Sequence, residues 1–338
     1  MQILCSGHHN SHFITITDYI EQAIKSLGHA VITFEDRCHI LPGRLRNRIK
    51  RLDKFDNSYI NKKFVSFALR NMPDIALIGG GNRIGRHSIQ TLNEKGISTV
   101  LWTTDPPKNF QEILEVAPEY KHIFCQGSEA TELFEKNDIK NSHFLPMACD
   151  PVYHFPVDID AKDKKKYGHD MVFVGSYYPS RLALFEKIAN FDLAIWGPGW
   201  DRLKGNPNLR LAIKGTHTTP SEWVKIYSAC KIVLAPHYEE ESKLFPVYQA
   251  SPRVFEAMAC GALVFSDHQK DVFSIFKDGE HLVGFRTLEE LLKKINYYLH
   301  HPEEREKIAN CGRQEVLKKH KYVNRLEKLL SIVGQKQA

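Results

Sequence analysis

The segment SPRVFEAMACGALVFSD, residues 251–267, constrains the fold more than any other part of the chain. Ser251 and Pro252 are typical of a helix start, a nearly continuous apolar surface follows them, and Gly261 is typical of a helix end. The next residues, Ala262 to Phe265, form a short apolar run that predicts a buried strand of a parallel sheet. An apolar helix that leads directly into an apolar strand is typical of α/β folds, in which helices cover both faces of such a sheet.

Glu256 is the one acidic residue of this predicted helix, and its neighbours Phe255 and Ala257 are apolar. Burying an ionised carboxylate costs several kcal/mol, roughly, unless the charge is paired or hydrogen-bonded. We therefore expect Glu256 to meet either a cation such as Arg253 or the hydroxyl groups of a ligand.

Strand and helix patterns alternate along the whole chain, which predicts a parallel sheet with helices on both faces in each half. In the first half, strands are predicted at 2–5, 30–34, 74–78, 98–102, 122–126 and 143–145, with helix caps at Thr17 and Ser128. In the second half, strands are predicted at 171–174, 193–196, 209–213, 232–235, 263–266 and 282–285. Thr219, Pro220 and Glu222 form a capping-box pattern, which predicts a helix from Pro220 to Ala229.

The predicted domains are residues 1–154 and 170–338, each Rossmann-like. Between them, residues 155–169 (FPVDIDAKDKKKYGH) lose apolar periodicity and are dominated by charge. This segment is interpreted as the interdomain linker.

Composition favours a globular protein of ordinary solubility, with 42% hydrophobic and 25% charged residues. No apolar run approaches the roughly 20 residues of a membrane span, and the apolar stretch at the start is too short for a signal peptide. The seven cysteines form neither a C-x-x-C pair nor a disulfide framework. We expect a cytoplasmic protein.

The net charge of +6 is concentrated in residues 44–70. This basic segment carries nine Lys or Arg residues against Asp53 and Asp56, a local balance of +7. One interpretation is a solvated helix face. The other is a contact with an anionic glycan, a lipid-linked acceptor or the headgroups of a membrane surface, where the protein would be peripheral. Nucleic acid is not favoured, because the segment has few aromatic residues for base stacking.

The pattern R-V-F-E-A-M-A-C-G-A, residues 253–262, resembles the C-terminal domain of nucleotide-sugar glycosyltransferases of the GT-B fold, in the branch that includes spore-maturation-protein-like members. Two further segments, DMVFVGSYYPSR (170–181) and DLAIWGPGW (192–200), resemble the first strands and turns of that domain. The resemblance implies two Rossmann-like domains that face each other across a cleft, and a terminal helix that crosses back to the first domain.

In this family the equivalent of Glu256 binds the ribose of the donor nucleotide, and the start of its helix lies near the diphosphate. Gly175 and Ser176 follow a strand and precede a helix, so their amides can face a diphosphate, with Arg181 adding positive charge. Gly197 and Trp200 are candidates for contact with the base, although a core tryptophan is an alternative. The candidate donor-binding residues are Gly175, Ser176, Arg181, Gly197, Trp200, His237, Ser251, Arg253 and Glu256.

Transfer of a sugar to a hydroxyl group requires a base, and His8 and Asp105 follow strands of the first half. Both are candidates for this catalytic role, and the alternatives are a structural histidine and a turn residue. The glycine cluster from Gly79 lacks the spacing of a dinucleotide-binding fingerprint.

Where many retaining GT-B enzymes have a second glutamate, eight residues before Glu256, this chain has Tyr248, so the stereochemical course is left open. We expect a metal-independent enzyme without a cofactor, in which Arg181 and Arg253 offset the leaving-group charge. The predicted function is glycosyl transfer from a nucleotide-diphosphate sugar to an unidentified acceptor. The alternatives are a nucleotide-sugar epimerase of the same fold and a noncatalytic nucleotide-sugar-binding protein.

Overall fold

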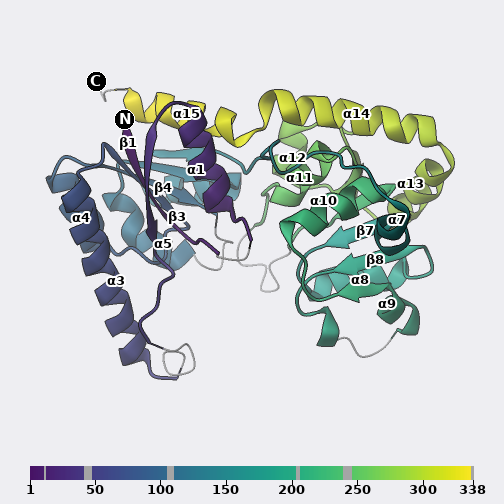
Figure 1. The fold of residues 1–338 in the computed structure, drawn as a ribbon, viewed down its shortest axis with the longest axis horizontal. Helices are drawn as coiled ribbons and strands as arrows, with labels where there is room; N and C mark the ends of the chain where they lie inside the picture. The colour runs from purple at the N-terminus through teal and green to yellow at the C-terminus, as the bar shows by residue number, and fades with distance from the viewer. Residues whose placement is uncertain (11–12, 42–47, 105–109, 203–205, 239–245, 336–338) are drawn as a thin grey trace. The chain divides into compact units, whose positions relative to one another are not determined.

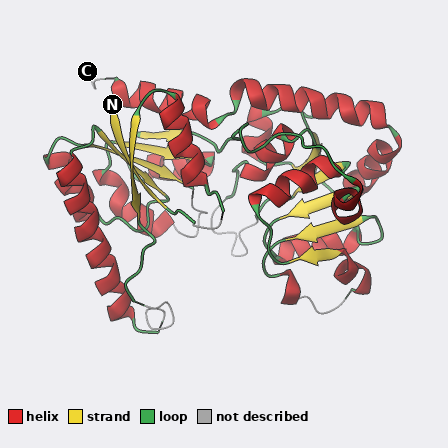
Figure 2. Ribbon diagram, in the orientation of Figure 1, coloured by secondary structure: helices red, strands yellow, loops and turns green. Residues whose placement is uncertain are grey.

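The computed structural model describes residues 1–10, 13–41, 48–104, 110–202, 206–238 and 246–335, and Figure 1 shows its fold. The chain divides into two compact units, the first made of Met1–Pro146 with Val323–Ala338 and the second of Met147–Tyr322. Among the described residues, each unit has one six-stranded sheet whose paired strands are all parallel. Figure 2 shows the helices of each unit arranged around its strands.

The sheet of the first unit has the strand order β2-β1-β3-β4-β5-β6. Its strands are β1 (Gln2–Gly7), β2 (Ala30–Glu35), β3 (Ile75–Gly79), β4 (Ser98–Thr103), β5 (His122–Cys125) and β6 (Ser142–Phe144). Its helices are α1 (Ile16–Ser26), α3 (Lys50–Asn71), α4 (Arg86–Glu94), α5 (Phe110–Val116), the 3-10 turn η2 (Ala117–Glu119) and α6 (Ser128–Lys136). Side chains of α3, α4, α5 and α6 pack with strand residues in one core, and α1 contacts β1 and β2.

The sheet of the second unit has the strand order β12-β11-β10-β7-β8-β9. Its strands are β7 (Met171–Val174), β8 (Leu193–Trp196), β9 (Ile213–Gly215), β10 (Ile232–Ala235), β11 (Leu263–Asp267) and β12 (Val283–Phe285). Its helices are α7 (Ala161–Tyr167), α8 (Pro179–Lys187), the 3-10 turn η3 (Trp200–Arg202), α9 (Pro207–Ala212), α10 (Pro220–Ala229), α11 (Pro252–Ala259), α12 (Lys270–Ile275), α13 (Leu288–His300) and α14 (Pro302–Lys319). Helices α8, α9, α13 and α14 contribute to the core, and α11 packs against β10, β11 and α14.

The predicted α/β fold with two Rossmann-like sheets is confirmed. The last helix, α15 (Tyr322–Gly334), belongs almost entirely to the first unit, where the Arg325 side chain donates a hydrogen bond to the Pro146 carbonyl. The terminal helix therefore returns to the first unit, as the resemblance implied.

The observed division of the chain differs from the predicted linker at 155–169. Helix α7 lies within that segment, capped by the Asp160 side chain, and packs against α10 inside the second unit. The sequence pattern does not indicate this helix, because most of its residues are charged and its buried residue is Tyr167.

The strand predicted at 209–213 is wrong in its first four residues. Residues 207–212 form α9, because the Asn206 side chain accepts hydrogen bonds from two amides of the first turn and Pro207 suits that turn. Only Ile213 belongs to a strand, β9. The first helix is capped by Thr15 in a capping box with Asp18, and not by Thr17.

In the part of the chain that the structure describes, no helix is both long enough and apolar enough to span a membrane.

Candidate functional site

The strand order of the second unit reverses between β7 and β10, which are neighbours in the sheet but distant in sequence. In open parallel sheets, ligands bind beyond the carboxyl ends of the strands at such a switch point. Gly175 and Ser176 directly follow β7, and Pro236 and His237 directly follow β10. The fold therefore brings these two loops, both predicted as donor-binding, to the same place.

The turn after β7 depends on two glycines that allow close backbone approach. A Cβ atom on Gly197, whose φ is +141°, would overlap the carbonyl group of Gly175. A Cβ atom on Gly175 would overlap the guanidinium group of Arg253. The glycine turn after β7 therefore lets the backbone of Gly175 approach the guanidinium group of Arg253 closely.

Trp200 lies beneath this turn in the hydrophobic core and is 0% exposed. Its indole N–H donates a hydrogen bond of 2.9 Å to the Gly175 carbonyl, and its ring packs against Phe173 and Phe185. In this structure Trp200 fixes the glycine turn from below and offers no exposed ring for a base. This is the core-tryptophan alternative raised by the sequence.

Arg181 projects from the first turns of α8 and bridges the two switch-point loops. Its Nε donates to the Pro236 carbonyl at 3.2 Å and its Nη1 to the Ser176 carbonyl at 2.9 Å. The side chain is buried, with its guanidinium 5.1 Å from the centroid of the Phe173 ring. Burial, reinforced by the charge of Arg253, lowers the pKa of Arg181 to about 9.

Arg253 lies on the other flank of the same turn, at the start of α11. Its Nε donates to the Val174 carbonyl at 2.5 Å, and its guanidinium lies 4.6 Å from the Phe173 ring centroid. Burial lowers the pKa of Arg253 as well. Its Nη1 is buried and has no hydrogen-bond partner in the described part of the chain.

The two guanidinium groups form a concentrated positive site. Because both lie over the ring of Phe173, the sum of their distances to its centroid bounds their separation at about 10 Å. Among the described residues, no carboxylate forms an ion pair with either group. Arg181 is buried and Arg253 is partly buried, and two such cations that form no ion pair among the described residues favour binding of an anion.

Glu256 follows Arg253 by three residues and so lies on the same side of α11. It is 7% exposed, and within the described ranges its carboxylate accepts no hydrogen bond; His154 Nε2 lies 3.9 Å from Oε1. Burial raises the pKa of Glu256 to about 7, although the charge of Arg253 opposes the increase. The same burial lowers the pKa of His154 to about 4, which keeps that imidazole neutral near pH 7. Of the two expected partners, Arg253 forms no ion pair with Glu256 in the described part of the chain, and a contact with ligand hydroxyl groups stays a prediction.

Ser251 occupies the N-cap position of α11, as predicted, but its hydroxyl makes no capping hydrogen bond. The Oγ atom is buried and has no partner among the residues described. A hydroxyl, a guanidinium nitrogen and a carboxylate at the start of one helix thus all lack hydrogen-bond partners within the described chain, which is rare for buried polar groups.

His237 uses both ring nitrogens within the protein. The Ser251 amide donates to Nε2 at 3.0 Å, so Nδ1 carries the proton and donates to Asp267 at 2.5 Å. Burial alone would raise the pKa of Asp267, but the interactions with His237 outweigh burial and lower it. His237 therefore holds the start of α11 against the end of β11, and it positions the site without a nitrogen left for a ligand.

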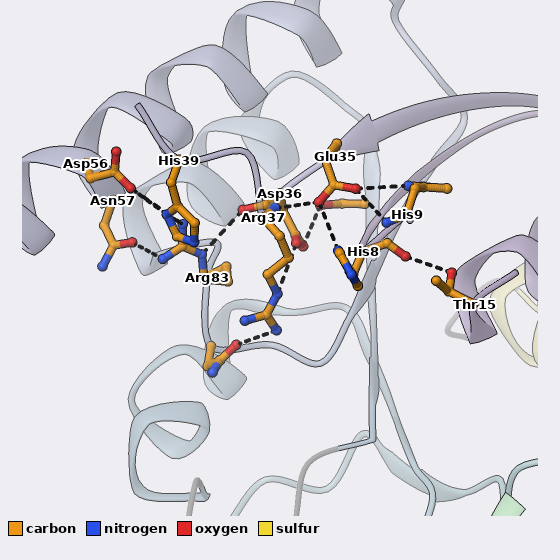
Figure 3. Close-up of polar contacts among 12 residues, drawn as sticks. His8, His9, Thr15, Glu35, Asp36, Arg37, His39, Asp56, Asn57 and Arg83 are labelled. Carbon is orange, nitrogen blue, oxygen red and sulfur yellow. Dashed lines mark hydrogen bonds and ion pairs between the residues drawn. The ribbon is translucent and has the colours of Figure 1, made fainter. Parts of the chain in front are cut away.

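A second polar cluster lies at the carboxyl ends of β1 and β2 in the first unit (Figure 3). Glu35, the last residue of β2, accepts hydrogen bonds from the backbone amides of His9 and Arg37. His8 Nδ1 lies 3.6 Å from Glu35 Oε1, and the His8 side chain is 53% exposed. His9 is more buried and its Nε2 lies 3.0 Å from Glu21. His8 is thus an accessible imidazole beside a fixed carboxylate.

Sequence reasoning missed Glu35, although an acidic residue at the end of a strand next to the His8 strand was a usable signal. The other candidate base, Asp105, lies outside the described residues. The glycine cluster after β3 contributes Arg83, whose side chain donates to the Asp36 carbonyl and contacts His39 (Figure 3). That arginine ties the loop after β3 to the loop after β2.

Within the described ranges, no three His, Cys, Asp or Glu side chains are arranged to hold a metal ion.

Two Rossmann-like units, of which the second holds a cationic site at its switch point, define the GT-B class of protein. Residues 181–331 match the family model described as "Glycosyl transferase-like". The resemblance inferred from the three sequence segments is thereby confirmed.

Several known proteins are similar to this chain. The spore protein CgeB of Bacillus subtilis (strain 168) is 21% identical over 256 residues, covering 72% of this chain and 78% of that protein. A glycosyltransferase from Rickettsia africae ESF-5 superposes with a TM-score of 0.67 at 14% identity, covering 100% of this chain and 99% of that chain. Anabaena HepE, in a crystal structure with UDP and glucose, gives a TM-score of 0.64 at 11% identity over 99% of both chains. At these identities the structural matches show the fold.

Proposed function

We propose that this protein transfers a sugar from a nucleoside-diphosphate sugar to an acceptor hydroxyl group. The observation that carries the proposal is the pair of guanidinium groups of Arg181 and Arg253, which form no ion pair in the described chain and flank a glycine turn. A diphosphate supplies the missing negative charge, and its oxygens match guanidinium donors in geometry.

Glu256 and Ser251 extend this assignment from the diphosphate to the nucleoside. A carboxylate that lacks donors can accept two hydrogen bonds from the vicinal hydroxyl groups of a ribose. During transfer, negative charge develops on the departing diphosphate, and Arg181 and Arg253 would stabilise it without reorganisation. In this proposal the two cations do the work that a metal ion does elsewhere, and neither a metal nor a cofactor is required.

The first test measures nucleotide binding by thermal shift with UDP, GDP and ADP, since HepE was crystallised with UDP. A nucleotide at 100 times its Kd should stabilise the protein by about 2.7 kcal/mol. For a unit of this size, that corresponds to roughly 5–10 °C in Tm. If none of the three nucleoside diphosphates raises Tm, the donor assignment is wrong.

A labelled donor then separates the reaction classes. With radiolabel in the sugar, transfer moves the label to an acceptor and slow hydrolysis moves it to free sugar. An epimerase of the same fold would keep the label within sugar or nucleotide-sugar pools and change the sugar's stereochemistry. A binding protein would shift Tm with nucleotide and leave the label in the unchanged donor.

We further propose that His8 is the general base for the acceptor hydroxyl and that Glu35 positions it. His8→Gln should lower kcat by roughly 10²-fold to 10⁴-fold, because proton removal by a placed base contributes about that much. Nucleotide affinity should stay at the wild-type value, since the residues assigned to the nucleotide belong to the second unit. Measurement of kcat and of calorimetric UDP affinity on one preparation tests both statements.

The exposed His300 at the end of α13 provides a matched control, and His300→Gln should leave kcat unchanged. If the His8→Gln variant kept its activity, His8 would not be the general base. Asp105 would then be the remaining candidate from the sequence.

A further inference from the structure

Helix α3 presents a face of cations and aromatic rings that the donor site does not use. Its exposed cationic side chains are Arg51, Lys54, Lys62, Lys63 and Arg70. Among the described residues, none of these five forms an ion pair. We call these five residues, with Phe55 and Tyr59, the basic face of α3.

The one acidic residue of α3 whose side chain the structure describes does not offset this charge. Asp56, whose side chain the structure describes, is fully buried on the inner side of the helix. It is bonded to His39 and to the amides of Ile40 and Leu41. The negative charge of Asp56 therefore interacts with groups inside the unit and does not neutralise the cations of the basic face.

Phe55 and Tyr59 are one helical turn apart and are 61% and 42% exposed. Both lie within one or two turns of Arg51 and Lys62, on the same side of the helix. Figure 1 shows the first turns of α3 extending beyond the strands of their own unit. Aromatic rings flanked by cations on an outward helix face are typical of a surface that lies in the headgroup region of a membrane.

A groove of about 740 Å³ lies between α3 and α4 and borders the basic face. Val65 and Leu69 contribute apolar lining, and Lys62 and His87 contribute polar groups. A cationic rim beside an apolar floor matches an amphiphile with an anionic headgroup and a hydrocarbon chain. A nucleic acid would match the cations but not the apolar floor.

We propose that the basic face of α3 binds the surface of an anionic lipid bilayer. The cations contact the headgroups, and Phe55 and Tyr59 enter the interface between headgroups and acyl chains. This inference goes beyond the proposed transferase reaction and is independent of it, because the residues involved belong to the first unit and the residues assigned to the nucleotide belong to the second.

The test is co-sedimentation of the full chain with vesicles of 30% phosphatidylserine in phosphatidylcholine at low ionic strength. The triple variant Arg51→Gln, Lys54→Gln, Lys62→Gln should lower the partition coefficient about 100-fold, since each neutralised cation loses roughly a factor of five. A matched control removes three exposed cations from helices of the second unit, Lys293→Gln, Lys307→Gln and Lys318→Gln. With the same change in net charge, this control should bind like the wild type.

Fluorescence of a Phe55→Trp variant tests insertion of the aromatic ring. Its emission should shift to the blue on anionic vesicles and stay unchanged on pure phosphatidylcholine. Three results would overturn the proposal: equal binding to both vesicle types, equal loss in the two triple variants, or no vesicle binding while duplex DNA binds through the same three cations.

Discussion

Glu256→Gln is expected to stabilise the ligand-free protein at pH 8 and, in the same molecule, to weaken its binding of UDP. Burial raises the pKa of Glu256 from 4.5 to about 7. The folded state therefore holds the proton more tightly than the unfolded state, and ionisation of this carboxyl destabilises the fold progressively between pH 4.5 and 7. Above pH 7 the cost is complete and amounts to about 3 kcal/mol.

Glutamine removes this cost, because it keeps the shape and carries no charge. The difference in free energy of unfolding between the variant and the wild type should be greatest above pH 7. It should disappear as the pH falls towards 4.5, the ordinary pKa of the group. Denaturant unfolding at pH 5 and pH 8 measures the difference directly. An ion pair with Arg253 would give the opposite sign, a loss of stability at pH 8, since the variant would strand a cation.

UDP affinity should respond in the other direction. Loss of the charge-assisted hydrogen bonds to the ribose should cost roughly 2–4 kcal/mol, which is about 30-fold to 1,000-fold in Kd. In the wild type, affinity should fall about tenfold for each pH unit below 7, because binding requires the ionised carboxylate. In the variant this dependence should be absent. Calorimetric titrations that show unchanged affinity at pH 8 would exclude Glu256 from the ribose site.

Three strands of the second unit could be predicted from the sequence, because the apolar pattern that defines each strand lies within a few consecutive residues. The strands β7, β8 and β10 lie at the predicted residues, 171–174, 193–196 and 232–235. A strand buried on both faces is a continuous apolar run, and each of these runs is followed by a glycine or a proline. The capping box at Thr219 likewise marked the start of α10, since both of its hydrogen bonds are made within four residues.

The partners of the site residues could not be predicted, because each is set by contacts distant in sequence. Arg253 donates to Val174, 79 residues away, in place of the expected pair with its neighbour Glu256. Trp200 turns into the core to meet the Gly175 carbonyl, 25 residues away. A sequence pattern shows that a charge needs a partner; only the tertiary packing decides which partner it has.

Arg253→Met is expected to weaken UDP binding by at least 100-fold and to leave the affinity for uridine unchanged. The guanidinium group loses its charge-assisted bonds to the diphosphate, each worth roughly 1.5–3 kcal/mol, whereas uridine has no phosphate to lose. Stability should be retained, because methionine fills a similar volume and removes a partly buried cation that forms no ion pair in the described chain. Isothermal titration with UDP and uridine, together with urea unfolding, gives the three quantities on one preparation.

Arg181→Met is the matched comparison, since it removes the second cation of the same site. It should also weaken UDP binding, but it should in addition destabilise the fold, because Arg181 donates to the Pro236 and Ser176 carbonyls that hold the two switch-point loops. Arg253 donates to one carbonyl and keeps Nη1 for a ligand. If Arg253→Met lowered uridine and UDP affinity equally, its role would be to shape the turn after β7, and the diphosphate would have to lie elsewhere.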